Sequence, residues 1–291
     1  MSFDHPIQRV QRNADPSAKF SIIIPTWNNL EYLKLCIGSI RKNSSLKHQL
    51  IIHINEGIDG SLDWIRSQEE ISYSYSEKNV GVCYALNSCR ELVKTDYILY
   101  MNDDMYVCPD WDKYLWEEIE RTGHDNFFFS STSIEPEPQS NCMIGHDFGR
   151  DLATFNEREL LAEYATLPFH DWQGATWPPN VVHKDLWDKV DGYSNEFSPG
   201  MYSDPDFSMK LWQAGVRLFK GVSKSRVYHF GSKSVKRVKQ NAGYKKFLEK
   251  WGMTNSTLSK YYLRRGEKFT GPLPEASVPL AAKVKNWVKK L

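Results

Sequence analysis

Four clusters of polar residues in the sequence contain side chains that bind metal ions or transfer protons. Each cluster comes directly after, or closes, an apolar run that predicts a β-strand. In a mainly parallel sheet the carboxyl ends of the strands meet at one edge, so we expect these side chains to lie close together. The clusters are Pro25-Thr26-Trp27-Asn28, Asn55-Glu56-Gly57-Ile58-Asp59-Gly60, Asn102-Asp103-Asp104, and His229 shortly before Gly231 and Ser232.

The adjacent aspartates Asp103 and Asp104 carry the clearest chemical signal. Two neighbouring carboxylates repel each other unless a cation offsets their charge. Oxygen ligands of this kind are preferred by Mg²⁺ and similar divalent ions. The alternative is that the pair caps a helix or lines a turn, which aspartates also do. Because the other polar clusters are expected at the same edge, we favour a metal site.

Alternating strands and helices are predicted to position these clusters. Such alternation implies βαβ crossovers and a mainly parallel α/β sheet. Asn28 and Glu31 have the spacing of a capping box for a helix behind the first strand. Residues 132–171 show no clear period. Strands are predicted at 20–24 (closed by Pro25), 50–54, 71–76, 97–101, 127–131, 216–220 and 227–230, and helices at 82–92, 111–121, 184–190 and 204–214, the last closed by Gly215.

Composition excludes several classes of protein. The 37 lysines and arginines nearly cancel the 36 aspartates and glutamates, so no overall field favours nucleic acid. The five cysteines are odd in number and form no CxxC pair, which favours reduced thiols over disulfides or a zinc site. No run reaches the ~18 to 20 apolar residues of a membrane span. We therefore expect a cytoplasmic protein that at most attaches peripherally to the inner face of the cell membrane.

Five motifs follow one another along about residues 20–230. They are FSIIIPTWNNLEYLKLCIGSI, NEGIDGSLDWI, EKNVGVCYALNSC, YILYMNDDMYVCPDW and SDPDFSMKLWQAG. An ordered set is far more specific than any single motif. This set resembles the family 2 glycosyltransferases, which have the GT-A nucleotide-sugar-binding fold, a Rossmann-like, mainly parallel sheet flanked by helices.

The resemblance implies an inverting, metal-dependent transfer of a hexose-type sugar from a nucleotide diphosphate. Mn²⁺ or Mg²⁺ would be held by Asp104 and His229, the histidine lying in a segment, VYHFGSKS, that is similar to the late metal-binding segment of the family. A core histidine is the alternative for His229. Asn102 stands where an aspartate is common, which leaves the ion chiefly to Asp104. The implied donor-binding residues are Pro25, Thr26, Asn28, Asn55, Glu56, Asp59, Asn79, Gly81, Asn102 and Asp103, although residues 55–60 are also good turn-forming residues.

Asp204 is the implied catalytic base, because it matches the position of the base in the family. A free aspartate titrates near ~3.9, so it can accept a proton at neutral pH. Ser203 replaces the acidic residue that commonly precedes the base. Asp204 and Asp206 could instead cap the helix that follows, and Trp172 and Trp177 could pack in the core. The implied acceptor-binding residues are Trp172, Trp177, Asn180 and Asp206.

The chain is predicted to comprise a polar extension (1–19), a GT-A domain (20–240) and a helical tail (241–291). The domain divides into a donor half (20–110) and an acceptor half (111–240). In the tail, Leu280, Val284, Trp287, Val288 and Leu291 fall on one face of a helix, opposite Lys283, Lys285, Lys289 and Lys290. Such a helix could rest on an anionic membrane or dock on its own domain. Basic residues are also frequent upstream, at Lys224, Arg226, Lys233, Lys236, Arg237 and Lys239.

The expected function is transfer of a sugar from a UDP- or dTDP-sugar to a hydroxyl of a glycan or lipid-linked acceptor in cell-surface polysaccharide synthesis. One alternative is a catalytically silent nucleotide-sugar or glycan-binding protein on the same fold. A second is a sugar-phosphate nucleotidyltransferase, which would need a glycine-rich phosphate loop after the first strand. The sequence has PTWNNLEY there, without glycine, which disfavours that alternative.

Overall fold

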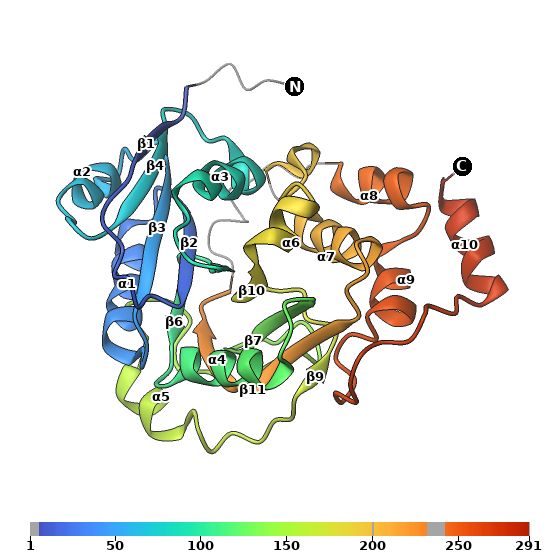
Figure 1. Ribbon diagram of the computed structural model, residues 1–291. Coiled ribbons are helices and arrows are strands. Elements are labelled where there is room, and N and C mark those ends of the chain that lie inside the picture. Colours follow the sequence, from blue (N-terminus) through green and yellow to red (C-terminus); the bar gives the residue numbers. More distant parts are fainter. Residues whose placement is uncertain (1–5, 200, 232–241, 291) are drawn as a thin grey trace.

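A computed structural model describes residues 6–199, 201–231 and 242–290 of the chain. In this part, eleven strands form one mixed sheet in the order β1-β4-β3-β2-β5-β10-β7-β11-β6, with β8 beside β7 and β9 beside β11 (Figure 1). The strands are β1 Gln8–Val10, β2 Phe20–Trp27, β3 His48–Asn55, β4 Ser72–Ser76, β5 Tyr97–Tyr100, β6 Met105–Val107, β7 Phe127–Glu135, β8 Met143–Gly145, β9 Trp172–Gln173, β10 Asn180–His183 and β11 Leu218–His229.

The strands β4, β3, β2 and β5 pair in parallel and form the first half of the sheet. The predicted mainly parallel α/β sheet is therefore confirmed in this half. The antiparallel strand β10 joins β5 to β7, and β11 then pairs in parallel with β7. One continuous sheet thus runs through both predicted halves of the domain.

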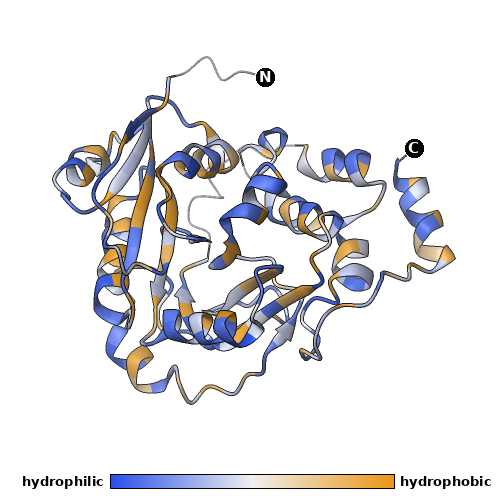
Figure 2. Cartoon of the chain, viewed as in Figure 1, coloured by the Kyte–Doolittle hydropathy of each residue, from blue (hydrophilic) through white to orange (hydrophobic). Residues whose placement is uncertain are grey.

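Helices cover both faces of the sheet. Side chains alternate between the faces along a strand, so Ile22 and Ile24 pack with α1 and α4, while Ile23 packs with α3, α6 and α7. The inner strands contain hydrophobic stretches, which are coloured orange in Figure 2. The helices are α1 Leu30–Asn43, α2 Ser61–Arg66, α3 Gly81–Cys89, α4 Trp111–Thr122, α5 Glu157–Glu163, α6 Lys184–Lys189, α7 Ser203–Gln213, α8 Gly243–Trp251, α9 Asn255–Thr257 and α10 Leu280–Lys290, with short 3₁₀ turns at Arg90–Leu92 and Asn195–Phe197 and a π-helical turn at Leu258–Tyr262.

Two sequence-based expectations about strands are wrong. β2 does not end at Pro25 but continues to Trp27, because it stays paired in register with β3 up to Asn55. The two short strands expected at 216–220 and 227–230 are one strand, β11, which is interrupted by a register shift between Val222 and Arg226. The region without a clear period contains the end of β7, then β8 and α5. In the polar extension, β1 pairs with β4 at the edge of the sheet.

The start of α1 also differs from the predicted capping box. Asn28 adopts a φ of 46°, outside the helix, and its side chain contacts the loop after β3. The carboxylate of Asp59 instead accepts a hydrogen bond of 2.7 Å from the backbone N–H of Leu30. A residue that is distant in sequence therefore satisfies one of the free amides at the start of this helix.

The remaining sequence-level expectations concern cysteines and membrane spans. All five cysteines are buried and unbridged, which confirms the expected reduced thiols. Across the residues that the structure describes, no helix has the length and apolar character to cross a membrane.

The expected helix at 280–291 is confirmed as α10, with Leu291 outside the described residues. Of the basic residues upstream, Lys233, Lys236, Arg237 and Lys239 also lie outside them, and Arg226 is buried against backbone carbonyls.

Candidate active site

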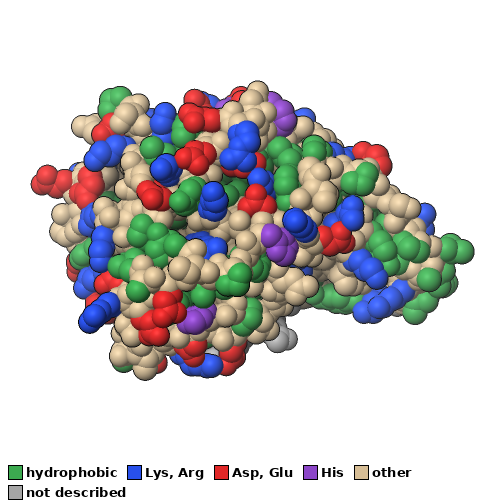
Figure 3. Space-filling model, turned by 90° about the horizontal axis from the view of Figure 1, so that it is seen from below, with side chains coloured by type: hydrophobic (Ala, Val, Ile, Leu, Met, Phe, Trp, Pro, Cys, Tyr) green, Lys and Arg blue, Asp and Glu red, His purple; other side chains and the backbone are tan. Residues whose placement is uncertain are grey.

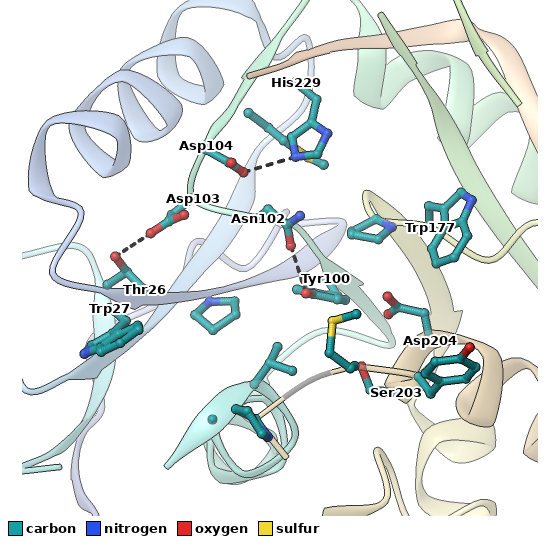
Figure 4. A pocket seen from close by; sticks show the side chains of 18 of the residues that line it. Thr26, Trp27, Tyr100, Asn102, Asp103, Asp104, Trp177, Ser203, Asp204 and His229 are labelled. Atoms are coloured by element: carbon teal, nitrogen blue, oxygen red, sulfur yellow. Dashed lines mark hydrogen bonds and ion pairs between the residues drawn. The ribbon is translucent and has the colours of Figure 1, made fainter. Parts of the chain in front are cut away.

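A cavity of about 630 Å³ opens at the carboxyl ends of β2, β3 and β5. It receives residues from the first strand loop, from the segment after β5, from the end of β11 and from the start of α7 (Figure 4). The tertiary structure thus brings together side chains that are up to about 200 positions apart in sequence. The predicted site residues that line the cavity are Pro25, Thr26, Asn55, Asn79, Gly81, Asn102, Asp103, Asp104, Trp177, Asp204 and His229.

Asp103 and Asn102 are held by neighbouring hydroxyl groups. Asp103 is buried, and its Oδ2 accepts a hydrogen bond of 2.6 Å from the hydroxyl of Thr26. The Tyr100 hydroxyl donates to Oδ1 of Asn102 over 2.8 Å. These bonds fix the segment between β5 and β6, so Asp103 and Asp104 have defined orientations (Figure 4).

Asp104 and His229 meet at the wall of the cavity. Their carboxylate Oδ1 and imidazole Nε2 atoms are 3.3 Å apart. They are adjacent because β6 and β11 pair antiparallel, with Met105 opposite His229. On its other side, Nδ1 of His229 lies 2.8 Å from Oε1 of Glu135, the last residue of β7. Two carboxylates therefore flank one imidazole.

The charges around His229 favour a cation at this place. Burial lowers the pKa of His229, but Asp104 and Glu135 raise it by more, to about 10. A proton or a metal ion can supply the positive charge that these two carboxylates require. Glu135 lies where it can accept a hydrogen bond from Nδ1–H, and a metal at Nε2 would take the place of the second ring proton, as in carboxylate–histidine–metal arrangements.

The residues fit a divalent ion that is completed by a ligand. In the described ranges, no group of three or more histidine, cysteine or acidic side chains has the arrangement of a closed metal site. Mg²⁺ and Mn²⁺ in phosphate-binding sites use only one or two protein ligands plus phosphate oxygens and water. Asp104 and His229 together provide such a pair, facing the cavity.

Asp204 lies on another part of the cavity wall, near Trp177 and Ser203 (Figure 4). It is the second residue of α7, and its carboxylate is partly buried. Burial raises the pKa of Asp204 to about 7, opposed by a weak contact of 3.5 Å from the Tyr193 hydroxyl. A carboxyl group poised near neutral pH can accept a proton and release it again, as a general base requires.

Asp206 is placed differently, although it is only two residues away. It is fully buried, and its carboxylate accepts hydrogen bonds from Ser194 at 2.6 Å and from the indole of Trp251 at 2.8 Å. Lys250 forms an ion pair with it at 2.8 Å. Asp206 does not belong to the described lining of the cavity, and its contacts tie α7 to α8.

Three of the predicted donor-binding residues form a network behind the cavity lining. Oε2 of Glu56 accepts hydrogen bonds of 2.8 Å from Asn28 and from the Trp27 indole. Asp59 binds the backbone amides of Leu30 and Ser61. Among the described residues, Asn28, Glu56 and Asp59 are not part of the cavity lining, whereas Trp27 is. Their contacts shape the loop that carries Trp27.

Asn55, Asn79 and Gly81 form one wall of the cavity. Asn55 accepts a hydrogen bond of 2.8 Å from the backbone of Val80, so β3 holds the start of α3 in place. Gly81 has a φ of 77°, and a Cβ there would stand 2.7 Å from Cα of Pro199. Only glycine permits this close approach of α3 to the segment before α7.

The predicted acceptor-binding residues are separated by the fold. Trp177 lines the cavity and stacks beneath Arg265, whose guanidinium carbon lies 4.7 Å from the ring centre. Trp172 is buried and donates to the Thr132 hydroxyl at 2.9 Å, and Asn180 is buried within β10. Among the described residues, Trp172 and Asn180 do not line the cavity.

Sequence reasoning missed several residues of the cavity. Glu135 lies in a region without a periodic signal, so nothing in the sequence linked it to His229. The sequence indicates Tyr100 only as part of a strand. In the structure Tyr100 lines the cavity, and its hydroxyl donates a hydrogen bond to Asn102. The other missed residues of the lining include Met201 and Tyr202, which directly precede α7, and Asn255, the first residue of α9.

Relatives in sequence and structure bear on the identity of this site. A curated Haemophilus influenzae protein named "Uncharacterized glycosyltransferase" is 22% identical over 201 residues, which cover 66% of this chain and 62% of that protein. The chain thus matches somewhat less than two thirds of the length of this relative.

Solved structures share the fold at low identity. The S. aureus TarS 1-349 structure in complex with UDP-GlcNAc superposes with a TM-score of 0.57 and 14% identity, over 94% of this chain and 71% of that one. The structure of GalNAc-T7 with UDP, GalNAc and Mn²⁺ has a TM-score of 0.56 and 13% identity, over 79% and 47% of the two chains. These similarities show the GT-A fold.

The profile of the family described as Glycosyl transferase family 2 matches residues 21–169, which carry the first strand loop, the Asp103-Asp104 pair and Glu135. This is just over half of the chain, and it agrees with the fold and with the cavity at the strand ends. The chain therefore belongs to glycosyl transferase family 2.

Proposed function

We propose that this family 2 glycosyltransferase transfers a sugar from a UDP- or dTDP-sugar to a hydroxyl of a glycan or lipid-linked acceptor, with inversion at the anomeric carbon. The observation that carries the proposal is the arrangement of one cavity. An aspartate–histidine pair that fits a divalent ion and a carboxyl group with a pKa near 7 line the same space. The metal-dependent, inverting transfer that we propose uses both groups, one for the leaving diphosphate and one for the proton of the acceptor hydroxyl.

The donor would lie against the first strand loop and the strand ends. Pro25, Thr26 and Trp27 line this side with Asn55 and Asp103. The Thr26 hydroxyl holds the Asp103 carboxylate in the cavity lining, where it would accept a hydrogen bond from a ribose hydroxyl. Relatives of this fold have been solved with UDP and with UDP-GlcNAc, which supports a uridine nucleotide as the first donor to test.

Asp104 and His229 would hold Mn²⁺ or Mg²⁺ against the diphosphate. When bound, the ion neutralises the charge that gathers on the leaving nucleotide diphosphate. Glu135 would accept a hydrogen bond from Nδ1–H of His229 and so orient the ring. The structure of GalNAc-T7, with Mn²⁺ and UDP in the same fold, supports this role.

Asp204 would take the proton of the acceptor hydroxyl as that oxygen attacks the anomeric carbon. The opposite face of the sugar carries the leaving diphosphate, so a single displacement inverts the centre. Trp177, beside Asp204 in the cavity, is a flat apolar surface on which an acceptor sugar could stack. The guanidinium carbon of Arg265 lies 4.7 Å from the centre of the Trp177 ring, over its face.

The test measures donor binding and turnover separately in wild type and Asp204→Asn. Calorimetry with UDP and Mn²⁺ reports binding, and nucleotide release from a panel of UDP- and dTDP-sugars reports turnover. We expect Asp204→Asn to reduce turnover at least a hundredfold while UDP affinity stays within about twofold, since a general base contributes about 10²–10⁴. Turnover at the wild-type rate would refute the assignment of the base.

Nucleotide release and pyrophosphate release together separate the two alternatives. A silent binding protein would bind the donor but release no nucleotide from any sugar in the panel, with or without an added acceptor. A nucleotidyltransferase would release pyrophosphate from a nucleoside triphosphate and a sugar phosphate. Asn102 and Ser203 are the residues whose types favour the silent alternative.

A further inference from the structure

The helix α10 packs against the protein by a polar residue. Its buried residue is Asn286, whose side-chain oxygen accepts hydrogen bonds from the hydroxyl of Thr257 at 2.9 Å and from the backbone and hydroxyl of Thr254 at 3.3 Å. A surface helix normally turns its apolar stripe towards the core and its polar residues towards water. In α10 this orientation is reversed.

The apolar stripe of α10 faces solvent as a result. Leu280 is 76% exposed, Val284 50%, Trp287 63% and Val288 56%. At about 100° per residue these four side chains fall within one sector of the helix. Figure 3 shows hydrophobic and basic side chains together at the end of the molecule where α10 lies in Figure 1. A contiguous exposed apolar surface of this kind marks an interaction site.

Lysines border this stripe on both sides. Helical spacing places Lys283 and Lys290 on one flank and Lys285 on the other, with Lys289 nearer the docked side. The sequence of α10, LAAKVKNWVKK, contains no acidic residue. An apolar stripe between lysines complements a surface that is apolar inside and anionic at its boundary, which is the headgroup region of an anionic bilayer.

We propose that α10 is a membrane-docking helix that lies in the plane of an anionic lipid surface, with Trp287 and Val288 among the acyl chains and the lysines at the headgroups. The Asn286 anchor holds the helix in this orientation without covering the stripe. A second copy of the chain fits less well, because a symmetric contact would bring two sets of four lysines together without a carboxylate from α10.

The position of α10 connects the membrane surface to the cavity. The ammonium group of Lys289 lies 5.6 Å from the ring centre of Tyr244 in α8, and that ring lies 6.0 Å from the ring of Tyr202. Tyr202 lines the cavity. Docking would thus hold one rim of the cavity beside the lipid surface. This consequence rests on the proposed function, since it favours a lipid-linked acceptor that stays in the membrane during transfer.

The test is co-sedimentation of the purified chain with vesicles of phosphatidylcholine alone or with 30% phosphatidylglycerol. We expect at least tenfold tighter binding to the anionic vesicles, weakened by 0.5 M NaCl. The double substitution Trp287→Ser with Val288→Ser should reduce binding at least tenfold, and Lys283→Gln with Lys290→Gln should reduce only the preference for anionic vesicles. Ile58→Ser is the matched control, because Ile58 is 85% exposed and lies outside α10.

Three results would overturn the proposal. The first is equal sedimentation with neutral and anionic vesicles. The second is unchanged sedimentation of the Trp287→Ser, Val288→Ser variant. The third is a dimer of the wild type, measured by light scattering, that the same variant converts to a monomer, because a second copy would then occupy the stripe. Melting temperatures of the variants within about 2 °C of wild type would show that the fold is intact, as expected for exposed side chains.

UDP binding in solution separates this proposal from the proposed function. All variants in α10 should bind UDP and Mn²⁺ as the wild type does, because none of these residues lines the cavity. Loss of vesicle binding in a chain that still binds UDP would remove only the docking proposal. Vesicle binding by a chain without affinity for any nucleotide would remove the proposed function and leave the docking helix.

Discussion

Asp204 and Asp206 stand two positions apart in α7, yet their surroundings give them different roles. Asp204 faces the cavity, and within the described parts of the chain no basic side chain forms an ion pair with it, so burial dominates and its pKa rises to about 7. Asp206 is surrounded by donors from Ser194, Trp251 and Lys250. Their burial and partners therefore distinguish the carboxylate proposed as the base from one that holds two helices together.

The raised pKa of Asp204 predicts how the reaction depends on pH. A base must be ionised to accept a proton, so kcat/KM should rise about tenfold per pH unit below pH ~7 and level off above it. The measurement is initial rates of nucleotide release between pH 5.5 and 9 in the presence of Mn²⁺. A profile that is already flat from pH 5.5 upward would show that the base titrates near the ordinary value of aspartate.

We expect Glu135 to act as a positioning residue for the proposed metal pair, because its Oε1 lies 2.8 Å from Nδ1 of His229. In Glu135→Gln the amide can still accept the Nδ1–H bond but no longer carries charge, so the imidazole becomes a weaker ligand. We expect the Kd for Mn²⁺ in the presence of UDP to rise about 10- to 100-fold, the range found for partners of metal-binding histidines.

Calorimetric titration with Mn²⁺ measures this effect without depending on turnover. Glu137→Gln is the matched control, because Glu137 lies two residues further on and pairs with Arg150 at the surface. An equal loss of Mn²⁺ affinity in both variants would mean that only the general negative charge matters. An unchanged affinity in Glu135→Gln would remove the positioning role.

At the scale of the elements, α7 depends on Asp206 for its attachment to α8. Asp206→Asn removes half of the ion pair with Lys250 and leaves that ammonium group without its buried partner, which should lower the free energy of unfolding by about 1–3 kcal/mol. Chemical denaturation measures the change. An unchanged free energy of unfolding would show that water replaces the contact that the Lys250 ammonium group loses in the variant.

Asp204→Asn should have the opposite effect on stability. Because the pKa of Asp204 is higher in the folded than in the unfolded state, its stabilising contribution is complete below pH ~4 and is lost as pH rises through about 7. The asparagine that replaces Asp204 in the variant does not titrate. The free energy of unfolding of Asp204→Asn, minus that of wild type, should therefore be larger at pH 8 than at pH 4.5. A difference in free energy of unfolding that is the same at both pH values would contradict the raised pKa of Asp204.

At the scale of the whole molecule, the cavity joins the first parallel strands to β11 and α7. A ligand that contacts all of these segments stabilises the folded chain by mass action, by about 2.7 kcal/mol at a hundredfold excess over Kd. We therefore expect UDP with Mn²⁺ to raise the melting temperature by several degrees in a thermal-shift assay.

EDTA serves as the control in that assay, because the diphosphate is expected to need the ion that bridges it to Asp104 and His229. UDP with EDTA should give less than half of the shift. An equal shift with and without the metal would count against a metal between the protein and the diphosphate. AMP, which has a single phosphate, should give a smaller shift than UDP.

The sequence by itself determined the first half of the sheet, the strand-end clusters and the family. Apolar runs such as FSIII and LIIHI, followed by polar residues, are local patterns, and local patterns specify strands and helices directly. The order of the motifs then identified the fold, and residues such as Thr26, Asp103, Asp104 and His229 were expected at one edge and are found there.

Only the tertiary structure decided which carboxylates share a space and which face of a helix is covered. Glu135 meets His229 because β7 and β11 are neighbours, and Asp59 caps α1 because two loops adjoin. Likewise, the amphipathic pattern of α10 is compatible with either face being buried, and the hydroxyls of Thr254 and Thr257 selected the polar one. Such contacts join residues that are distant in the chain, so no local pattern encodes them.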